Sequence, residues 1–313
     1  MYERFFGLRE RPFDLTPNPR FLLLTPTHRE ALANLEYGLR AQKGLTLLIG
    51  EAGTGKTTLV RRALASRIDA GGGNCVYLNN PTLTHREFYE FLAEQFGLPE
   101  GTVSSKAQFL LAIERELRRR QERGEQSVLV IDEAQSLPDE LLEEVRLLAN
   151  IETDTTKLLP LILAGQPELA TRLNQIGLRQ LKQRVALRCQ LAPLTLAETA
   201  AYIAGRIQLA GGDASTMLSR DAVIAVHDYS HGIPRTISVL CDNALLTAFA
   251  TGERPVTEKT VRGVARDFDV AAAPPRPSAA PAKAGQEDGA AGRTGAKRKI
   301  VPMFDAPSVW PRA

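Results

Sequence analysis

The chain has 313 residues, of which 43% are apolar, and a formal net charge of +3. This length allows about two domains, and mixed charges of this kind exclude a chain-wide basic field for nucleic acid or membrane surfaces. No uncharged run approaches the roughly 18 residues that a membrane span needs, so we expect no membrane insertion.

Cysteine and histidine usage excludes two further classes. The three cysteines show no C-x-x-C spacing, and the four histidines show no ligand grouping apart from the loose pair His227 and His231. We therefore expect reduced thiols in a cytoplasmic protein rather than a disulfide framework or a zinc site. The opening MYERFFGLRERPFD carries charges throughout, and we expect no signal peptide.

The first 43 residues are predicted to be ordered. Residues 2–27 mix aromatic residues, prolines and charges, which is typical of an irregular segment that packs on a neighbour. Four phenylalanines are expected to make this contact: Phe5, Phe6, Phe13 and Phe21. Thr27 with Glu30 fits a helix cap, and the apolar spacing that follows predicts a helix up to Gly44.

The stretch 44–58, GLTLLIGEAGTGKTT, passes from an apolar strand through a glycine-rich loop into a helix. It fits G-x-x-x-x-G-K-[ST], in which glycines let backbone amides approach a triphosphate and the helix start adds its positive dipole. Lys56 is predicted to bind the β- and γ-phosphates, and Thr57 to bind Mg²⁺. A ligand-free turn would not explain why strand, motif and helix coincide. The predicted nucleotide site comprises Gly50, Glu51, Ala52, Gly53, Thr54, Gly55, Lys56, Thr57 and Thr58.

The next segments complete a βαβ unit. A crossover helix is predicted over 59–70 and a second strand over 75–78, and two further helices over 84–96 and 105–123. The last of these ends in Arg118, Arg119, Arg120 and Arg123. A basic last turn complements the helix dipole, and contact with nucleic acid is the alternative interpretation.

The run Ser127–Ile131 is typical of a buried parallel strand and is followed by Asp132 and Glu133. Asp132 stands at the carboxyl end of the strand, where it can bind Mg²⁺ through water. Glu133 can orient and polarise the attacking water. The alternative is that the two acids only begin a loop.

A helix is predicted to open at Pro138 and to carry apolar residues on one face as far as Ile151. Another buried strand is predicted after it, over 158–164. It is followed by Gln166, which would face the crevice at the strand ends and hold the γ-phosphate or the water. Alternatively, the Gln166 amide binds local backbone. Cationic helical residues 169–184 then lead to a fifth strand, 185–191.

Beyond Pro193 the strand signals stop. Thr195 with Glu198 forms a capping box, and three or four helices are expected up to about residue 269. The remainder is rich in Ala, Pro and Gly and should be disordered, with a docking peptide within 300–310 as an alternative. We expect an N-terminal segment and helix (1–43), an α/β domain (44–192), a helical lid (193–270) and a disordered tail (271–313).

This pattern predicts an α/β fold in which five buried parallel strands are flanked by helices. Several stretches are more specific: MYERFFGLRERPFDLTPNPRFL, GEAGTGKTT, VLVIDEAQ, LILAGQPEL, LRQLKQRV and HGIPRTISVLCDNAL. Through them, residues 1 to 268 resemble the AAA+ ATPases, and within these the ExeA-type ATPases of general secretion and of pilus or exopolysaccharide export. The resemblance implies a five-stranded P-loop AAA+ sheet, a small all-α lid, and ATP with Mg²⁺ as ligands.

The resemblance also implies roles that spacing alone leaves open. Gln166 would be the first sensor of the γ-phosphate. Arg235, in the GIPR stretch of the lid, would be the second sensor and bind the nucleotide. Arg184 would be the arginine finger that enters the site of the next subunit, with Arg179 as the competing choice. Local alternatives are a surface cation for Arg184 and a helix-end salt bridge for Arg235.

Two functions of different class follow. In the first, the protein is an oligomeric ATPase in the cytoplasm, or at the inner membrane through a partner, that drives or regulates an envelope export apparatus. In the second, it is an ATP-dependent DNA-binding regulator that resembles the transposition ATPases; the near-neutral charge disfavours this. A nucleotide-sensing scaffold is a third possibility, disfavoured by intact Lys56, Asp132 and Glu133. Membrane-bound relatives continue into a transmembrane helix and a peptidoglycan-binding module, neither of which we expect here.

Overall fold

The computed structural model describes residues 1–14, 24–68, 73–79 and 81–271. Within these residues, one parallel sheet has five strands in the order β2-β3-β4-β1-β5. The strands are β1 (Leu45–Gly50), β2 (Asn74–Leu78), β3 (Ser127–Ile131), β4 (Leu161–Gly165) and β5 (Val185–Leu191). The predicted parallel α/β architecture is confirmed. Phe21 and the predicted tail from residue 272 on lie outside the described residues.

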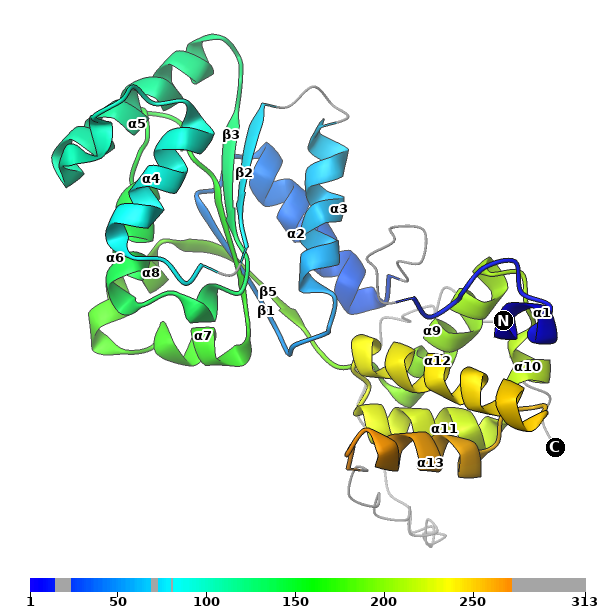
Figure 1. Cartoon of the computed structure of the whole chain (residues 1–313). Helices are drawn as coiled ribbons and strands as arrows, with labels where there is room; N and C mark the ends of the chain where they lie inside the picture. Colours follow the sequence, from blue (N-terminus) through cyan, green and yellow to red (C-terminus); the bar gives the residue numbers. More distant parts are fainter. Residues whose placement is uncertain (15–23, 69–72, 80, 272–313) are drawn as a thin grey trace, which may run out of the picture.

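Two helical layers enclose this sheet (Figure 1). One layer consists of α2 (Pro26–Arg40) and α3 (Lys56–Ile68). The other consists of α4 (His85–Phe96), α5 (Lys106–Glu122), α6 (Asp139–Leu148), α7 (Pro167–Arg172) and α8 (Arg179–Gln183). Short 3₁₀ turns lie between these helices at η2 (Thr102–Ser104), η3 (Ala134–Ser136) and η4 (Ile176–Leu178).

Alternate residues of the strands supply the two cores between these layers. Leu47 of β1 belongs to the core with α4, α5 and α6, whereas its neighbour Leu48 belongs to the core with α2 and α3. Both side chains are buried, because a central parallel strand is covered on both faces. This is why such strands appear in the sequence as uninterrupted apolar runs.

The prediction of five buried strands is wrong for β5. This strand pairs only with β1 and lies at the edge of the sheet. Ala186, Arg188 and Gln190 are exposed, whereas Cys189 and Leu191 are buried against the α2 side. The alternation in VALRCQL therefore reflects one covered face.

Three local predictions also change. The cap of α2 is Thr25 rather than Thr27, because Pro26 takes the first helical position and Thr25 Oγ1 accepts from the His28 amide. Strand β4 begins at Leu161, three residues later than expected, because Pro160 and the residues before it form the preceding connection. The helix that opens after Pro138 ends at Leu148, before residue 151.

The helical part, residues 196–267, comprises five helices among the described residues, whereas the sequence predicted three or four. They are α9 (Leu196–Leu209), α10 (Ala214–Met217), α11 (Arg220–Ser230), α12 (Pro234–Thr251) and α13 (Glu258–Asp267). The additional element, α10, has only four residues, a length that gives no periodic signal. The capping box of Thr195 and Glu198 at the start of α9 is present.

The N-terminal segment with α1 (Tyr2–Phe6) packs on this helical part, although the sheet follows it more closely in the chain (Figure 1). Phe6 and Phe13 are buried in the core of α9, α11, α12 and α13. The buried Arg206 of α9 donates hydrogen bonds to the carbonyl oxygen of Pro12 and to the Tyr202 hydroxyl. The two ends of the described chain therefore share one apolar core.

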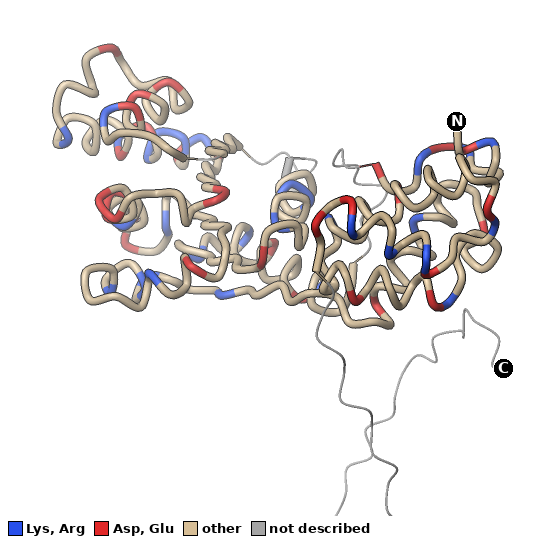
Figure 2. Tube along the Cα trace, turned by 60° about the horizontal axis from the view of Figure 1, so that its bottom comes forward, with Lys and Arg blue, Asp and Glu red and all other residues tan. Residues whose placement is uncertain are grey.

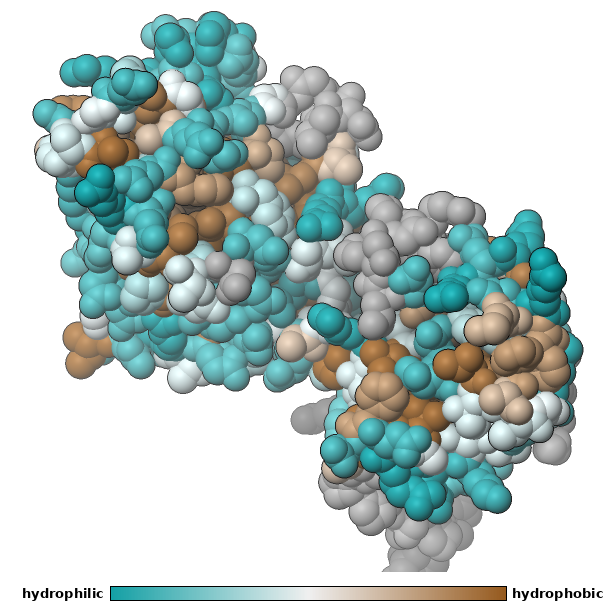
Figure 3. Space-filling model, viewed as in Figure 1, coloured by the Kyte–Doolittle hydropathy of each residue, from teal (hydrophilic) through white to brown (hydrophobic). Residues whose placement is uncertain are grey.

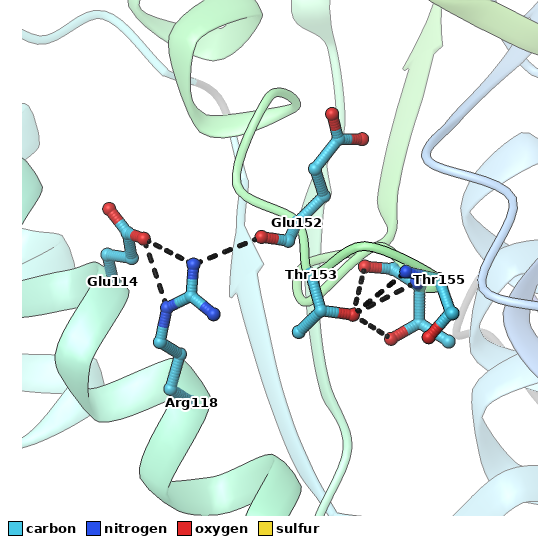
Figure 4. A network of polar contacts seen from close by, with 6 residues as sticks. Glu114, Arg118, Glu152, Thr153 and Thr155 are labelled. Carbon is cyan, nitrogen blue, oxygen red and sulfur yellow. Dashed lines mark hydrogen bonds and ion pairs between the residues drawn. The ribbon is translucent and has the colours of Figure 1, made fainter.

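The four arginines near the end of α5 all have carboxylate partners. Arg118 pairs with Glu114 and also donates to the carbonyl oxygen of Glu152 (Figure 4). Arg119 and Arg120 both pair with the buried Glu116. Arg123 pairs with Glu125. These ion pairs give all four arginines partners within the chain.

Acidic and basic residues are interspersed along both parts (Figure 2), and hydrophilic residues mix with apolar ones on the face drawn in Figure 3. Among the described residues, no helix combines the length and the apolar character that crossing a bilayer requires.

The contact of the N-terminal segment can be tested with Phe13→Ala. Phe13 is 1% exposed, so this substitution should lower the free energy of unfolding by about 3–5 kcal/mol in urea titrations. Phe268→Ala is the matched control, because Phe268 is 48% exposed. Equal losses in both variants would contradict the packing of this segment.

Candidate functional site

The glycine-rich loop lies between β1 and α3, at the carboxyl end of the strand. Gly53 (φ 80°) and Gly55 (φ 96°) have left-handed backbone conformations that favour glycine. A Cβ atom on Gly53 would lie 2.8 Å from the Cβ of Arg235, so the helical part approaches the loop too closely for a side chain. Thr54 Oγ1 donates to the carbonyl oxygen of Glu51 at 2.8 Å and holds the loop curled.

Lys56 is the first residue of α3 and is 4% exposed. Its Nζ donates to the carbonyl oxygens of Gly50 at 2.8 Å and Glu51 at 3.1 Å. Burial lowers the pKa of this amine, while the carboxylates of Glu133 and Asp132 act in the opposite direction. The curled loop thus encloses a cation beside the helix start, which fits an anionic polyphosphate.

His28 of α2 also holds the loop, a role that sequence reasoning missed. Its Nε2 lies 3.1 Å from the carbonyl oxygen of Thr54, and its Nδ1 lies 2.6 Å from Thr25 Oγ1. Because a carbonyl oxygen only accepts, Nε2 carries the proton, and the loop is anchored to α2. A histidine 26 positions before Thr54 gives no local pattern from which this contact can be inferred.

Asp132 is fully buried at the end of β3, where three donors surround it. Thr57 Oγ1 donates to Asp132 Oδ2 at 2.6 Å, and Tyr77 donates to the same oxygen at 2.7 Å. The backbone amide of Glu133 donates to Oδ1 at 3.0 Å. The structure thus brings together the predicted hydroxyl and carboxylate ligands of Mg²⁺.

This donor set fits magnesium. Mg²⁺ prefers oxygen ligands and often takes only one or two from the protein, the rest coming from phosphates and water. Across residues 1–14, 24–68, 73–79 and 81–271, no group of three or more His, Cys, Asp or Glu side chains could hold a metal. Thr57 and Asp132 supply two oxygen donors of the kind that Mg²⁺ takes from proteins.

Tyr77 is the second residue that sequence reasoning missed. It lies on β2, and burial raises the pKa of its hydroxyl. The hydrogen bond to Asp132 raises this pKa further. The guanidinium carbon of Arg61 lies 6.0 Å from the centre of its ring. A tyrosine in an apolar strand looks like a core residue in the sequence, so only the register of β2 beside β3 reveals this contact.

Glu133 and Gln166 lie close together although 33 residues separate them. Gln166 Nε2 donates to Glu133 Oε2 at 3.4 Å. Gln135 Nε2 donates to the same oxygen at 2.6 Å, and Gln135 Oε1 accepts from the Gln166 amide at 3.0 Å. Gln135 lies in the VLVIDEAQ stretch, but its position there does not by itself indicate a role.

The three predicted arginines differ in their relation to the loop. The Arg235 amide donates to the carbonyl oxygen of Gly53 at 3.2 Å, while its side chain is exposed. Arg184 and Arg179, at the two ends of α8, are also exposed. Neither guanidinium makes a hydrogen bond or ion pair with another residue that the structure describes, and the structure does not bring them to the loop.

Residues 39–173 match the AAA domain family. The chain has the AAA+ fold. The chain is also 42% identical over 256 residues to general secretion pathway protein A of Aeromonas hydrophila. This match covers 82% of the chain but 46% of the relative, so the chain spans about half of that protein's length. The resemblance to ExeA-type proteins is therefore confirmed.

Solved structures support the same fold. The Cdc6p structure from Pyrobaculum aerophilum has a TM-score of 0.63 and 18% identity. The match covers 82% of this chain and 70% of the Cdc6p chain. The Aeropyrum pernix ORC1 protein in complex with DNA has a TM-score of 0.61 and 20% identity, and the match covers 83% of this chain and 70% of the ORC1 chain. The Aeropyrum pernix ORC2 protein, in its ADPNP–ADP complexes, has a TM-score of 0.60 and 18% identity, and the match covers 82% of this chain and 71% of the ORC2 chain.

The hydrogen bond between Tyr77 and Asp132 can be tested by Tyr77→Phe. Loss of a hydroxyl that donates to a buried carboxylate should lower the free energy of unfolding by about 1.5 kcal/mol or more. Tyr37→Phe is the matched control, since Tyr37 is 52% exposed, and should change it by less than about 0.5 kcal/mol. Urea titration of both variants gives the comparison, and a neutral Tyr77→Phe would contradict the contact.

Proposed function

We propose that this AAA+ protein binds ATP with Mg²⁺ and hydrolyses it to ADP and phosphate. The hydrogen bond between Thr57 and Asp132 carries this proposal, because it joins the glycine-rich loop to the acidic strand end at one point. A hydroxyl and a carboxylate at that point suit an ion that bridges the protein and the phosphates. The match to the AAA domain family supports the same chemistry.

Each residue then has a defined task. The loop amides and Lys56 bind the phosphates, and Thr57 and Asp132 would hold Mg²⁺, which would supply positive charge beside the phosphates. Glu133 orients and polarises the attacking water. Gln166, hydrogen-bonded to Glu133, senses the γ-phosphate from the end of β4.

The positions of Arg235 and Arg184 suggest how bound nucleotide could contact the helical part and a neighbouring subunit. Arg235 contacts the loop through its backbone, so its exposed side chain can reach the nucleotide from the helical part. Arg184 is exposed, makes no hydrogen bond or ion pair among the described residues, and can supply positive charge to an adjacent subunit. We therefore propose a homo-oligomer in which turnover requires assembly.

We propose export as the cellular role, in the cytoplasm or at the inner membrane through a protein partner. The 42% identity to general secretion pathway protein A supports this, although only about half of that protein is represented. The alternative is a DNA-binding regulator, since one solved structure of similar fold was determined in complex with DNA. The ion pairs of Arg118, Arg119, Arg120 and Arg123 disfavour this alternative.

Hydrolysis is tested with Lys56→Ala and Glu133→Gln. Lys56→Ala should remove nucleotide binding or turnover, whereas Glu133→Gln should retain bound ATP and lower kcat by about 100-fold or more. Phosphate release and binding of a fluorescent ATP analogue measure the two effects. Normal turnover in Glu133→Gln would refute its role.

Phosphate release should also be measured with duplex DNA at two salt concentrations. On the export role, DNA leaves the rate unchanged. A strongly DNA-stimulated and salt-sensitive rate would favour the regulator instead.

The finger is tested by mixing variants. Arg184→Ala and Lys56→Ala should each be inactive alone, but their mixture should recover part of the ATPase rate, because an intact site can receive Arg184 from the other subunit. The same mixture with Arg179→Ala is the control that distinguishes the two arginines. Absence of recovery with Arg184→Ala would refute its action between subunits.

A further inference from the structure

We propose that Gln135 is a positioning residue that fixes the Glu133 carboxylate beside Gln166 for activation of water. This inference rests on the proposed ATPase function and adds a residue to it. The Gln135 side chain touches both of these candidate residues and is the bridge between them.

The amide of Gln135 has only one orientation that satisfies both contacts. The backbone N–H of Gln166 can only donate, so Gln135 Oε1 must face it, at 3.0 Å. Gln135 Nε2 then faces Glu133 Oε2, at 2.6 Å, where it donates to a carboxylate. A hydrogen bond to a charged acceptor is stronger than a neutral one, which makes this bridge an effective clamp.

The backbone around Gln135 is itself held in place. Gln135 lies in η3, and its carbonyl oxygen accepts from Arg172 Nη1 at 2.7 Å. Arg172 is fixed in turn by an ion pair with Asp139. A Cβ atom on Gly165 would lie 3.1 Å from Gln135 Oε1, so the glycine leaves room for the amide against β4.

The two oxygens of the Glu133 carboxylate differ in their hydrogen bonds. Oε2 accepts from both Gln135 and Gln166. Oε1 has no hydrogen-bond or ion-pair partner among the residues that the structure describes. The anchored oxygen sets the orientation of the group, and the other oxygen remains available to accept a proton from water. Glu133 itself has a left-handed backbone (φ 52°), a conformation that residues other than glycine rarely adopt.

The test is Gln135→Met, which keeps the length of the side chain but removes both polar atoms. We expect kcat for ATP hydrolysis to fall by on the order of 100-fold, as for other small misplacements of a catalytic group. KM and the Kd of a fluorescent ATP analogue should stay within about twofold, because the hydrogen bonds of Gln135 in the described part of the chain go to Glu133, Gln166 and Arg172 and not to the loop. Gln175→Met, at an exposed position, is the matched control and should keep the wild-type kcat.

A second comparison distinguishes positioning from general damage. In single-turnover measurements, Gln135→Met should lower the rate in the wild-type background but change it less than about twofold in the Glu133→Gln background, because residues that act as a unit are not additive. Equal losses in both backgrounds, or weaker ATP binding, would show a structural role and overturn the inference. Normal kcat in Gln135→Met would also overturn it.

The wild-type protein separates this inference from the function on which it rests. If the wild type hydrolyses ATP and Glu133→Gln does not, a neutral Gln135→Met refutes only the positioning role. If purified wild type has no Glu133-dependent hydrolysis, the proposed function and the inference both fail.

Discussion

The hydrogen bond from Thr57 to Asp132 is the contact on which the site depends. It joins the first turn of α3 to the end of β3, two segments that lie 75 residues apart. Asp132 is fully buried, and a buried carboxylate is stable only when donors surround it. Thr57, Tyr77 and the Glu133 amide supply those donors, so the groups that suit Mg²⁺ also stabilise the fold at this point.

Contacts from outside the sheet complete the loop. His28 of α2 binds the carbonyl oxygen of Thr54, and Arg235 of α12 binds that of Gly53. The loop is therefore fixed from both the α/β part and the helical part. The N-terminal segment packs on the same helical core to which α12 belongs.

The predicted binding groups and the predicted catalytic groups of the candidate site are held in different ways. Lys56, enclosed by the loop, and Asp132, enclosed by donors, are preorganised. Among the described residues, the Glu133 carboxylate accepts hydrogen bonds from the side-chain amides of Gln135 and Gln166, and Arg184 is exposed. On the proposed function, the binding groups are thus fixed within one subunit, whereas Arg184 would act at the site of a neighbouring one.

The sequence alone was sufficient for the parallel α/β fold, because apolar runs, the Gly-Lys-Thr loop and helix caps are local patterns. It also predicted Thr57 and Asp132 as ligands of one magnesium ion. Only the tertiary structure placed the N-terminal segment on the helical part and revealed the contacts of His28, Tyr77 and Gln135. Those contacts join residues far apart in the chain, and their geometry depends on strand register and packing, which local patterns do not encode.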